Sequence, residues 1–473
     1  MLFNSVEFLI FFPIVCLLYF ILPHRIRHIW LIISSLVFVA FNEPFAVVFL
    51  LLVTLITWGL GLLIAKAREK DKDAKSGRIF VVIGLFTIFG ILAYVKYVPY
   101  ILSLFKAGSV EVILPIGISF YTFSTATYLI DVYKGECEPC GNILKYAAYA
   151  TFFPTILSGP IERAKNMIPQ FDEVHTPDYD RMKDGLKLML WGYFLKMVIV
   201  SRLTILTDTV YADDAAFTGI SVLIAILMYS FQIYCDFAGY SFIAIGCARV
   251  CGFNVMRNFR QPYLAKSVAD FWRRWHISLS SWFKDYLYIP LGGNRKGTFR
   301  KYLNVMIVFA VSGIWHGANV TFLIWGLMNG AYQVIGGLVR SLMKKLKLKE
   351  FPGWLSVIWT YLLISFTWVF FSADSFNTAI SIIGRVFSGN FLAGFSPKVL
   401  YDMGLGTNNL VFVLAALAIL IVADFICEKK KCDISELLTN TAWPVRLAVY
   451  WILVTMILFS TNLSTQEFLY MNF

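Results

Sequence analysis

The chain has 473 residues, of which 59% are hydrophobic and only 15% are charged, and its formal net charge is +12. Soluble domains average about 45–50% apolar and about 25% charged residues, so this chain lacks the polar side chains to cover a surface in water. The composition therefore excludes a soluble globular protein. It predicts an all-α integral membrane protein, because helices pair their own backbone groups inside lipid.

The positive charge favours membrane topology over nucleic-acid binding. Lys and Arg cluster in short segments beside apolar runs, at Lys66–Arg78, Arg340–Lys349 and Lys429–Lys431. Short basic loops mark the cytoplasmic side of a membrane protein. An aromatic-basic platform for single strands is not visible outside the apolar runs. We therefore expect no nucleic-acid partner, and we expect a multi-pass chain in contact with the lipid of the cell (plasma or inner) membrane.

Apolar runs recur along the whole chain, and a helix needs about 20 apolar residues to cross the hydrocarbon core. The runs are Val6–Leu22, Phe45–Ile64, Ile79–Tyr97, Val112–Ile130, Met189–Leu206, Ile220–Ile233, Val305–Trp315, Phe322–Val339, Trp354–Phe371, Leu410–Ile426 and Val445–Phe459. Several are short or interrupted by a charge, so we expect about 11 transmembrane helices plus re-entrant or interfacial helices. The first run lacks a basic leader and a small-residue cleavage site, which predicts a retained span.

The polar stretches between these runs are each too short to bury a core of their own. We therefore expect a single membrane domain over residues 1–473, with N-terminal helices over about 1–110, a catalytic core over about 111–340 and C-terminal helices over about 341–473. Cys137 and Cys140 form a C-x-x-C pair, but a zinc site needs a second pair of ligands nearby. We therefore expect no metal and no bound cofactor.

The stretch Ser267–Tyr288 predicts an amphipathic helix at the membrane interface or in a polar cavity. Ser267, with Asp270 three residues later, can cap its start. The apolar residues follow steps of three and four, so they share one face of the helix. His276 is expected at the border of that face, next to Arg273 and Ser280.

His316 interrupts the apolar run 305–323, where an ionisable side chain is expensive and usually functional. Gly313 and Gly317 leave one helix face bare, so another backbone or a substrate can approach there. Burial disfavours the imidazolium, and a neutral ring can accept a proton from a hydroxyl that attacks a carbonyl. A buried structural histidine that donates to a backbone carbonyl fits the pattern equally well.

Other polar residues are weaker candidates. Ser312 and Asn319 flank His316, and either can hold its ring in one tautomer. Asp236 interrupts another apolar run, and a structural partner such as an arginine fits it slightly better than a catalytic role. His175 lies in a polar loop and is expected to be solvated. The sequence contains no phosphate loop, no G-x-S-x-G elbow and no H-E-x-x-H motif.

The sequence resembles the membrane-bound O-acyltransferase family, in the bacterial branch of alginate O-acetylation and teichoic-acid D-alanylation proteins. The resemblance covers nearly the whole chain and is closer to the alginate type. It rests on MLFNSVEFLIFFPIVCLLYFILP at the start, LPIGISFYTF (114–123), SGPIERA (158–164), NFRQPYLAKSVADFWRRWHISLSSWFKDYLYIPLGGNR (258–295), VSGIWHGANVTFLIWG (311–326) and EFLYMNF (467–473). One departure is Phe242, because the alginate type has an acidic residue after its D-F-[SA]-G-Y-S motif.

The resemblance implies a tunnel across the membrane, with His316 as the catalytic histidine and His276 as the second histidine. Residues expected to line the tunnel or contact substrate are Asp236, Arg273, Arg274, Ser312, Trp315 and Asn319. Arg273, Arg274 and Lys284 can guide an acidic donor, although snorkelling at the interface explains such residues as well. The expected reaction moves an acyl group, expected to be acetyl, from a cytoplasmic thioester, acetyl-CoA or an acyl carrier protein, to a hydroxyl outside.

The acceptor is expected to be an extracytoplasmic polysaccharide or cell-wall polymer, reached directly or through an extracytoplasmic acetyltransferase or esterase-like partner. D-alanyl transfer to teichoic acid from a carrier protein is one alternative. A non-enzymatic transporter of a lipid-linked sugar or small solute is another, since it also needs broken helices and buried polar groups. A structural subunit of a polymer-secretion machine is the third.

Overall fold

The computed structural model describes residues 1–70, 75–105, 115–157, 159–212, 216–349, 351–389, 391–392 and 397–460, and within these ranges the regular elements are all helical. The terminal motif 467–473 and the expected division near residue 110 lie outside these ranges. The chain forms two compact units, Met1–Leu190 with Tyr240–Arg257 and Trp191–Gly239 with Asn258–Phe473. The single membrane domain expected from the sequence stays a prediction.

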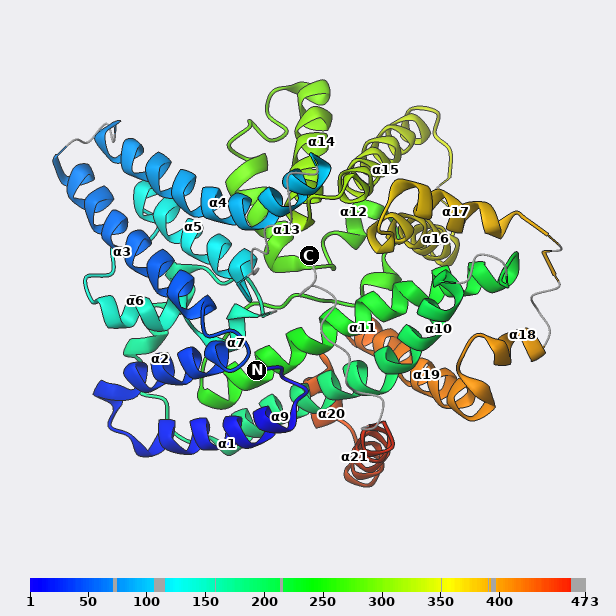
Figure 1. Cartoon of the computed structure of the whole chain (residues 1–473), viewed down its shortest axis with the longest axis horizontal. Coiled ribbons are helices and arrows are strands. Elements are labelled where there is room, and N and C mark those ends of the chain that lie inside the picture. The colour runs from blue at the N-terminus through cyan, green and yellow to red at the C-terminus, as the bar shows by residue number, and fades with distance from the viewer. Residues whose placement is uncertain are drawn as a thin grey trace. The chain divides into compact units, whose positions relative to one another are not determined.

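The first unit is built from apolar helices and short connecting turns (Figure 1). Its elements are α1 (Val6–Ile21), α2 (His24–Ala40), α3 (Ala46–Lys70), α4 (Lys75–Leu104), α5 (Ile118–Lys134), α6 (Ile143–Ala150), α7 (Phe153–Ile156), α8 (Ala164–Met167), the 3₁₀ turn η1 (Pro169–Asp172) and most of α9 (Tyr179–Tyr193). Helices α3, α4 and α5 pack against one another.

His175 belongs to this unit, and the expectation that it is solvated is wrong. Its side chain is buried, and its Nδ1 shares a 2.9 Å hydrogen bond with the hydroxyl of Tyr19. The ring packs against Phe253 with centroids 4.7 Å apart. A polar loop in sequence therefore folds back onto α1 and the residues after α11 (Ile220–Cys251), which only a long-range contact can decide.

The second unit contains the remaining helices. Its elements are the π-helical segment η2 (Phe194–Val200), α10 (Ser201–Ala212), the first part of α11, the 3₁₀ turn η3 (Pro262–Leu264), α12 (Val268–Phe271), α13 (Ile277–Phe283), the π-helical segment η4 (Lys284–Tyr288), α14 (Gly297–His316), α15 (Val320–Lys345), α16 (Gly353–Ser372), α17 (Phe376–Val386), α18 (Pro397–Asp402), α19 (Gly406–Lys430), α20 (Ile434–Thr439) and α21 (Trp443–Leu458).

Hydropathy predicts the membrane helices well. In the described ranges, seven helices are long and apolar enough to cross a membrane, and each of them overlaps a predicted run. The shorter apolar helices Val6–Ile21 and Trp443–Leu458 match two more runs. The apolar residues Leu9, Ile10 and Leu17 on α1 are more than half exposed, as lipid contact requires. The chain is thus an all-α membrane protein, while the number of about 11 crossings remains a prediction.

Helices α14 and α15 lie against each other along their length (Figure 1). A side chain at Gly313 would collide with the carbonyl of Phe322, and one at Gly326 would collide with the carbonyl of Phe309. The sequence left two neighbours open for the bare helix face around Gly313, another backbone or a substrate. The structure places another backbone, that of α15, against it. This close packing fixes the end of α14, where His316 lies.

Candidate active site

The predicted helix over 267–288 is interrupted at His276, so the prediction of one continuous helix is wrong. Ser267 caps α12 as expected, because its Oγ accepts from the amide of Asp270 at 3.1 Å. Helix α12 then ends at Phe271, and His276 takes the left-handed conformation with φ 43° and ψ 56°. Helix α13 starts directly after it. The break covers residues 272–276, and the sequence pattern missed it because the spacing of apolar residues does not encode contacts with distant segments.

His276 is buried rather than placed at the border of an exposed face, since only 1% of the residue is accessible. The ring of Phe237 meets its imidazole edge-on, with centroids 4.6 Å apart and planes at 90°. Burial lowers the pKa of His276 to about 3. The ring is therefore neutral at pH 7, and a neutral imidazole both accepts and donates a hydrogen bond.

His316 is the last residue of α14 and is 3% accessible. Aromatic rings surround its imidazole. The centroids of Trp325 and Phe371 lie 4.9 Å and 5.2 Å away, both nearly perpendicular to it, and Phe322 is stacked at 6.5 Å. Such an enclosure excludes water, which strengthens any electrostatic interaction inside it.

Trp315 connects the two histidines. Its ring centroid lies 4.7 Å from that of His316 and 6.5 Å from that of His276. The fold therefore brings together the two histidines predicted from the sequence, together with the predicted Trp315. Two imidazoles beside one buried indole provide groups that can accept and donate protons.

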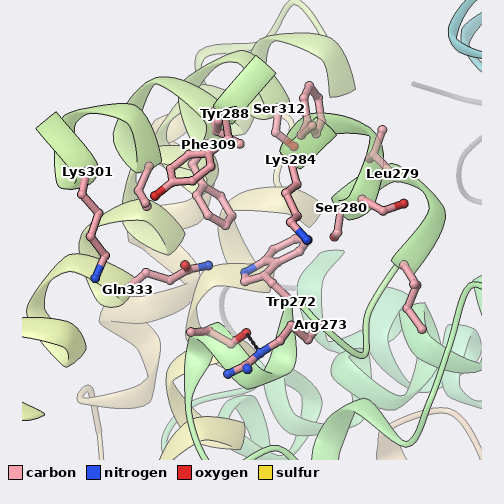
Figure 2. A pocket seen from close by; sticks show the side chains of 16 residues that line it. Trp272, Arg273, Leu279, Ser280, Lys284, Tyr288, Lys301, Phe309, Ser312 and Gln333 are labelled. Carbon is pink, nitrogen blue, oxygen red and sulfur yellow. Dashed lines mark hydrogen bonds between the residues drawn. The ribbon is translucent and has the colours of Figure 1, made fainter. Parts of the chain in front are cut away.

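A cavity of about 470 Å³ is lined by sequence neighbours of this pair, and His276, Trp315 and His316 are not among its lining residues. Its wall includes Ile277, which directly follows His276, and Ser312, which lies one turn before His316. Figure 2 shows Lys284 pointing into the cavity toward Trp272. The complete lining is Ala269, Trp272, Arg273, Ile277, Leu279, Ser280, Ser281, Phe283, Lys284, Tyr288, Lys301, Val305, Val308, Phe309, Ser312 and Gln333.

The cavity is apolar inside and carries three cations from three elements: Arg273 after α12, Lys284 on η4 and Lys301 on α14 (Figure 2). Sequence reasoning identified the first two and missed Lys301. It stands at the exposed start of an apolar helix, where a lysine is usually a solvated end residue. A slot with an apolar wall and a cationic rim suits a ligand that has an apolar arm and an anionic head.

The neighbouring Arg274 behaves differently from Arg273. Its guanidinium donates to both carboxylate oxygens of Glu428, at 2.7 Å and 3.0 Å, and to Asp270 at 3.1 Å. This bidentate pair joins the segment after α12 to the end of α19. Arg274 is not among the residues that line the cavity, and its ion pairs give it a structural role that links two segments of the chain.

Two further predicted tunnel residues have structural partners. Asn319 caps α15, where its Oδ1 accepts from the amide of Thr321 at 3.1 Å, and its amide donates to the carbonyl of Asp374. Asp236 forms a buried ion pair with Lys196. A basic structural partner for Asp236 was expected, with arginine as the example, and the structure shows a lysine in that position.

Comparison with known proteins shows the family of this chain. The sequence profile of MBOAT, the membrane-bound O-acyltransferase family, matches residues 141–376. A protein named as a probable alginate O-acetylase from Pseudomonas putida is 37% identical over 401 residues, which is 82% of this chain and 80% of the relative. The peptidoglycan O-acetyltransferase of Helicobacter pylori is 32% identical over 81% of this chain and 79% of its own length. The teichoic acid D-alanyltransferase of Bacillus subtilis is 27% identical over 55% of this chain and 69% of its own length.

Fold and site together define a helical membrane protein with two buried histidines beside an apolar, cation-rimmed cavity. The chain belongs to the membrane-bound O-acyltransferase family. It is therefore an O-acyltransferase, and it is more similar to the alginate O-acetylases than to the D-alanyltransferases. The transporter and structural-subunit alternatives lose their basis, because the relatives are named as transferases or acetylases.

Proposed function

We propose that the protein transfers an acetyl group from a cytoplasmic thioester to a hydroxyl of an extracytoplasmic polysaccharide or cell-wall polymer. The observation that carries the proposal is the contact of both buried histidines with Trp315 beside the cation-rimmed cavity. The similarity to proteins named for O-acetylation of alginate and of peptidoglycan supports acetyl as the group and a glycan as the acceptor.

His316 acts as the general base. Its neutral imidazole takes the proton of the acceptor hydroxyl while the hydroxyl oxygen attacks the thioester carbonyl carbon. The carbon–sulfur bond then breaks, the new ester keeps the acetyl group, and the leaving thiolate takes the proton back from the imidazolium. The aromatic rings around His316 keep water away and so suppress hydrolysis of the thioester.

His276 serves as a hydrogen-bond donor to the thioester carbonyl oxygen. A neutral imidazole has one N–H, and its burial makes that donor stronger toward a developing oxyanion than it would be in water. Removing one such donor typically costs about 10²–10³-fold in turnover. This role differs from that of His316, which must accept a proton.

The donor enters from the cytoplasm with its phosphates at Arg273, Lys284 and Lys301 and its thioester arm in the apolar slot. Acetyl-CoA and an acyl carrier protein present the same phosphate-bearing arm. The basic ends of α15 and α19, at Lys344 and Lys345 and at Lys429 and Lys430, support a cytoplasmic position for that side of a multi-pass protein in the plasma or inner membrane. The acetyl group leaves on the other side, directly or through an extracytoplasmic transferase that completes the reaction.

The test measures polymer acylation in cells that lack the gene, complemented with wild type, His316→Ala or His276→Ala at matched membrane levels. His24→Ala serves as the control, because its partly exposed ring lies in α2, outside the site. Mild base releases the ester-linked groups for identification by mass.

We expect acetate from wild type and His24→Ala, none from His316→Ala, and a loss of at least about 10²-fold from His276→Ala. Full acylation with a folded His316→Ala protein would remove the general-base assignment. Release of alanine in place of acetate would favour D-alanyl transfer.

A further inference from the structure

The start of helix α13 is capped by a residue from another part of the chain. Among the described residues, the side chain of His276, which holds the N-cap position, makes no cap hydrogen bond. Asn258 supplies it instead. Its backbone carbonyl accepts from the amide of Ile277 at 2.9 Å, and its Oδ1 accepts from the amide and the hydroxyl of Ser278 at 3.4 Å and 2.6 Å.

These bonds satisfy the amides that a helix start normally leaves for its own N-cap side chain. A histidine whose ring serves another purpose cannot also provide that cap. Asn258 is fully buried and lies 20 residues before Ser278, so its position is set by the fold rather than by local flexibility.

A second contact lies on the other side of His276. The amide of Arg260 donates to the carbonyl of Arg274 at 3.0 Å, so the segment 258–260 holds the chain both before and after the histidine. Between these two contacts His276 adopts φ 43°, which is unfavourable for a residue with a Cβ atom. The surrounding hydrogen bonds must maintain this conformation, and it determines the direction in which the imidazole leaves the backbone.

We propose that Asn258 is a positioning residue that holds His276 in the left-handed conformation and so aims its ring at Phe237 and Trp315. The proposal rests on the function proposed above for His276. Asn258 does not touch the reacting atoms; it acts through the amides that follow His276. Without its Oδ1, the first turn of α13 loses its cap, and the chain at 276 can relax toward an ordinary helical conformation.

The test combines hydrogen exchange with kinetics on the full chain in native membranes. Asn258→Ala removes the side-chain acceptor and keeps the backbone carbonyl that accepts from Ile277. Asn258→Asp keeps a side-chain acceptor oxygen, and Ser278→Ala is a milder variant that removes only the hydroxyl donor. Asn304→Ala is the matched control, because Asn304 is also fully buried and donates to the carbonyl of Gly293 at 3.0 Å, away from His276. Exchange is read by mass spectrometry on peptides that contain Ile277 and Ser278. Turnover is read as transfer from radiolabelled acetyl-CoA to polymer in isolated cell envelopes.

We expect Asn258→Ala to speed exchange at Ile277 and Ser278 and to lower kcat by about 10²-fold, with KM for acetyl-CoA unchanged within about twofold. Ser278→Ala should lower kcat by less, and Asn258→Asp should restore exchange protection and most of the activity. Asn304→Ala should speed exchange near Gly293, with Ile277 and Ser278 still protected.

Unchanged exchange at Ile277 and Ser278 in Asn258→Ala would overturn the proposal. Equal changes in kcat and KM, or a loss that Asn258→Asp does not rescue, would also overturn it. His276→Ala is measured alongside. Full activity of His276→Ala would refute the role of His276 in the proposed function, and the exchange data would still decide separately whether Asn258 holds this turn.

Discussion

Lys196 and Asp236 form an ion pair, with 2.5 Å between Nζ and Oδ1, in which both side chains are almost fully buried. Lys196 lies on the π-helical segment η2, and Asp236 lies on α11, one residue before the Phe237 that packs on His276. The pair thus joins two membrane helices next to the contact between Phe237 and His276. This placement favours a structural role over a tunnel-lining role for Asp236.

Replacing one partner of this ion pair should destabilise the protein more than replacing both partners. Lys196→Met leaves the carboxylate without its partner in a low-dielectric interior, and such losses cost about 3–5 kcal/mol. We expect a lower melting temperature in detergent for Lys196→Met and for Asp236→Leu. The double variant should recover much of the loss, because neither charge then remains buried. Purely additive losses in the double variant would contradict direct pairing.

The buried His276 should make stability depend on pH. Its pKa falls from 6.5 to about 3 on folding, so between these values the folded chain binds fewer protons than the unfolded chain. The contribution of His276 to the free energy of unfolding is therefore complete above about pH 6.5 and is lost as the pH falls toward 3, by about 2 kcal/mol at pH 5.

Melting temperatures at pH 7 and pH 5 test this expectation. The drop should be smaller for His276→Gln than for wild type, whereas His24→Gln should behave as wild type. An equal drop in wild type and His276→Gln would show that other groups cause it.

The adjacent arginines Arg273 and Arg274 should respond to substitution in different ways. Arg273→Ala should raise KM for acetyl-CoA several-fold, since it lines the cavity, and the effect should weaken at high salt because salt screens exposed charges. Arg274→Ala should instead lower the melting temperature, because it leaves Glu428 and Asp270 without their cation. Parallel melting curves and Michaelis profiles separate the two. A raised KM for Arg274→Ala with unchanged melting would place it with the donor site.

Lys284 and Lys301 should share the behaviour of Arg273. We expect Lys284→Ala and Lys301→Ala each to raise KM for acetyl-CoA, and the triple variant to lose most of its salt dependence. The measurement is KM at low and high ionic strength in the same envelopes. Lys349→Ala is a matched control, because that exposed lysine lies outside the cavity. A KM that rises equally with Lys349→Ala would point to general surface charge.

The close approach of α14 and α15 should not tolerate a methyl group. In Gly326→Ala the new Cβ would meet the carbonyl of Phe309, which is backbone and cannot turn away. Overpacking of this kind costs about 1–3 kcal/mol. We expect a lower melting temperature and, because His316 ends α14, a lower kcat. Gly336→Ala is the control on the same helix, since its Cβ would meet open space. Equal behaviour of both variants would refute the packing argument.

The amino-acid sequence by itself determined the class of protein. The thickness of the bilayer sets the length of an apolar run, so hydropathy located the long helices without any tertiary information. The motifs around His276 and His316 identified the family and the two histidines, and the cap at Ser267 was readable because it depends on residues three apart.

Only the tertiary structure decided which groups surround these residues. The break at His276, the cap from Asn258 and the pairing of Arg274 with Glu428, 154 residues away in sequence, all depend on contacts between distant segments. Local spacing does not encode such contacts. The same limit explains why the sequence did not reveal the positions of Lys301 and His175. Lys301 lines the cavity, and His175 is buried in a hydrogen bond with Tyr19. A polar residue in a sequence is solvated or functional according to what the rest of the chain places beside it.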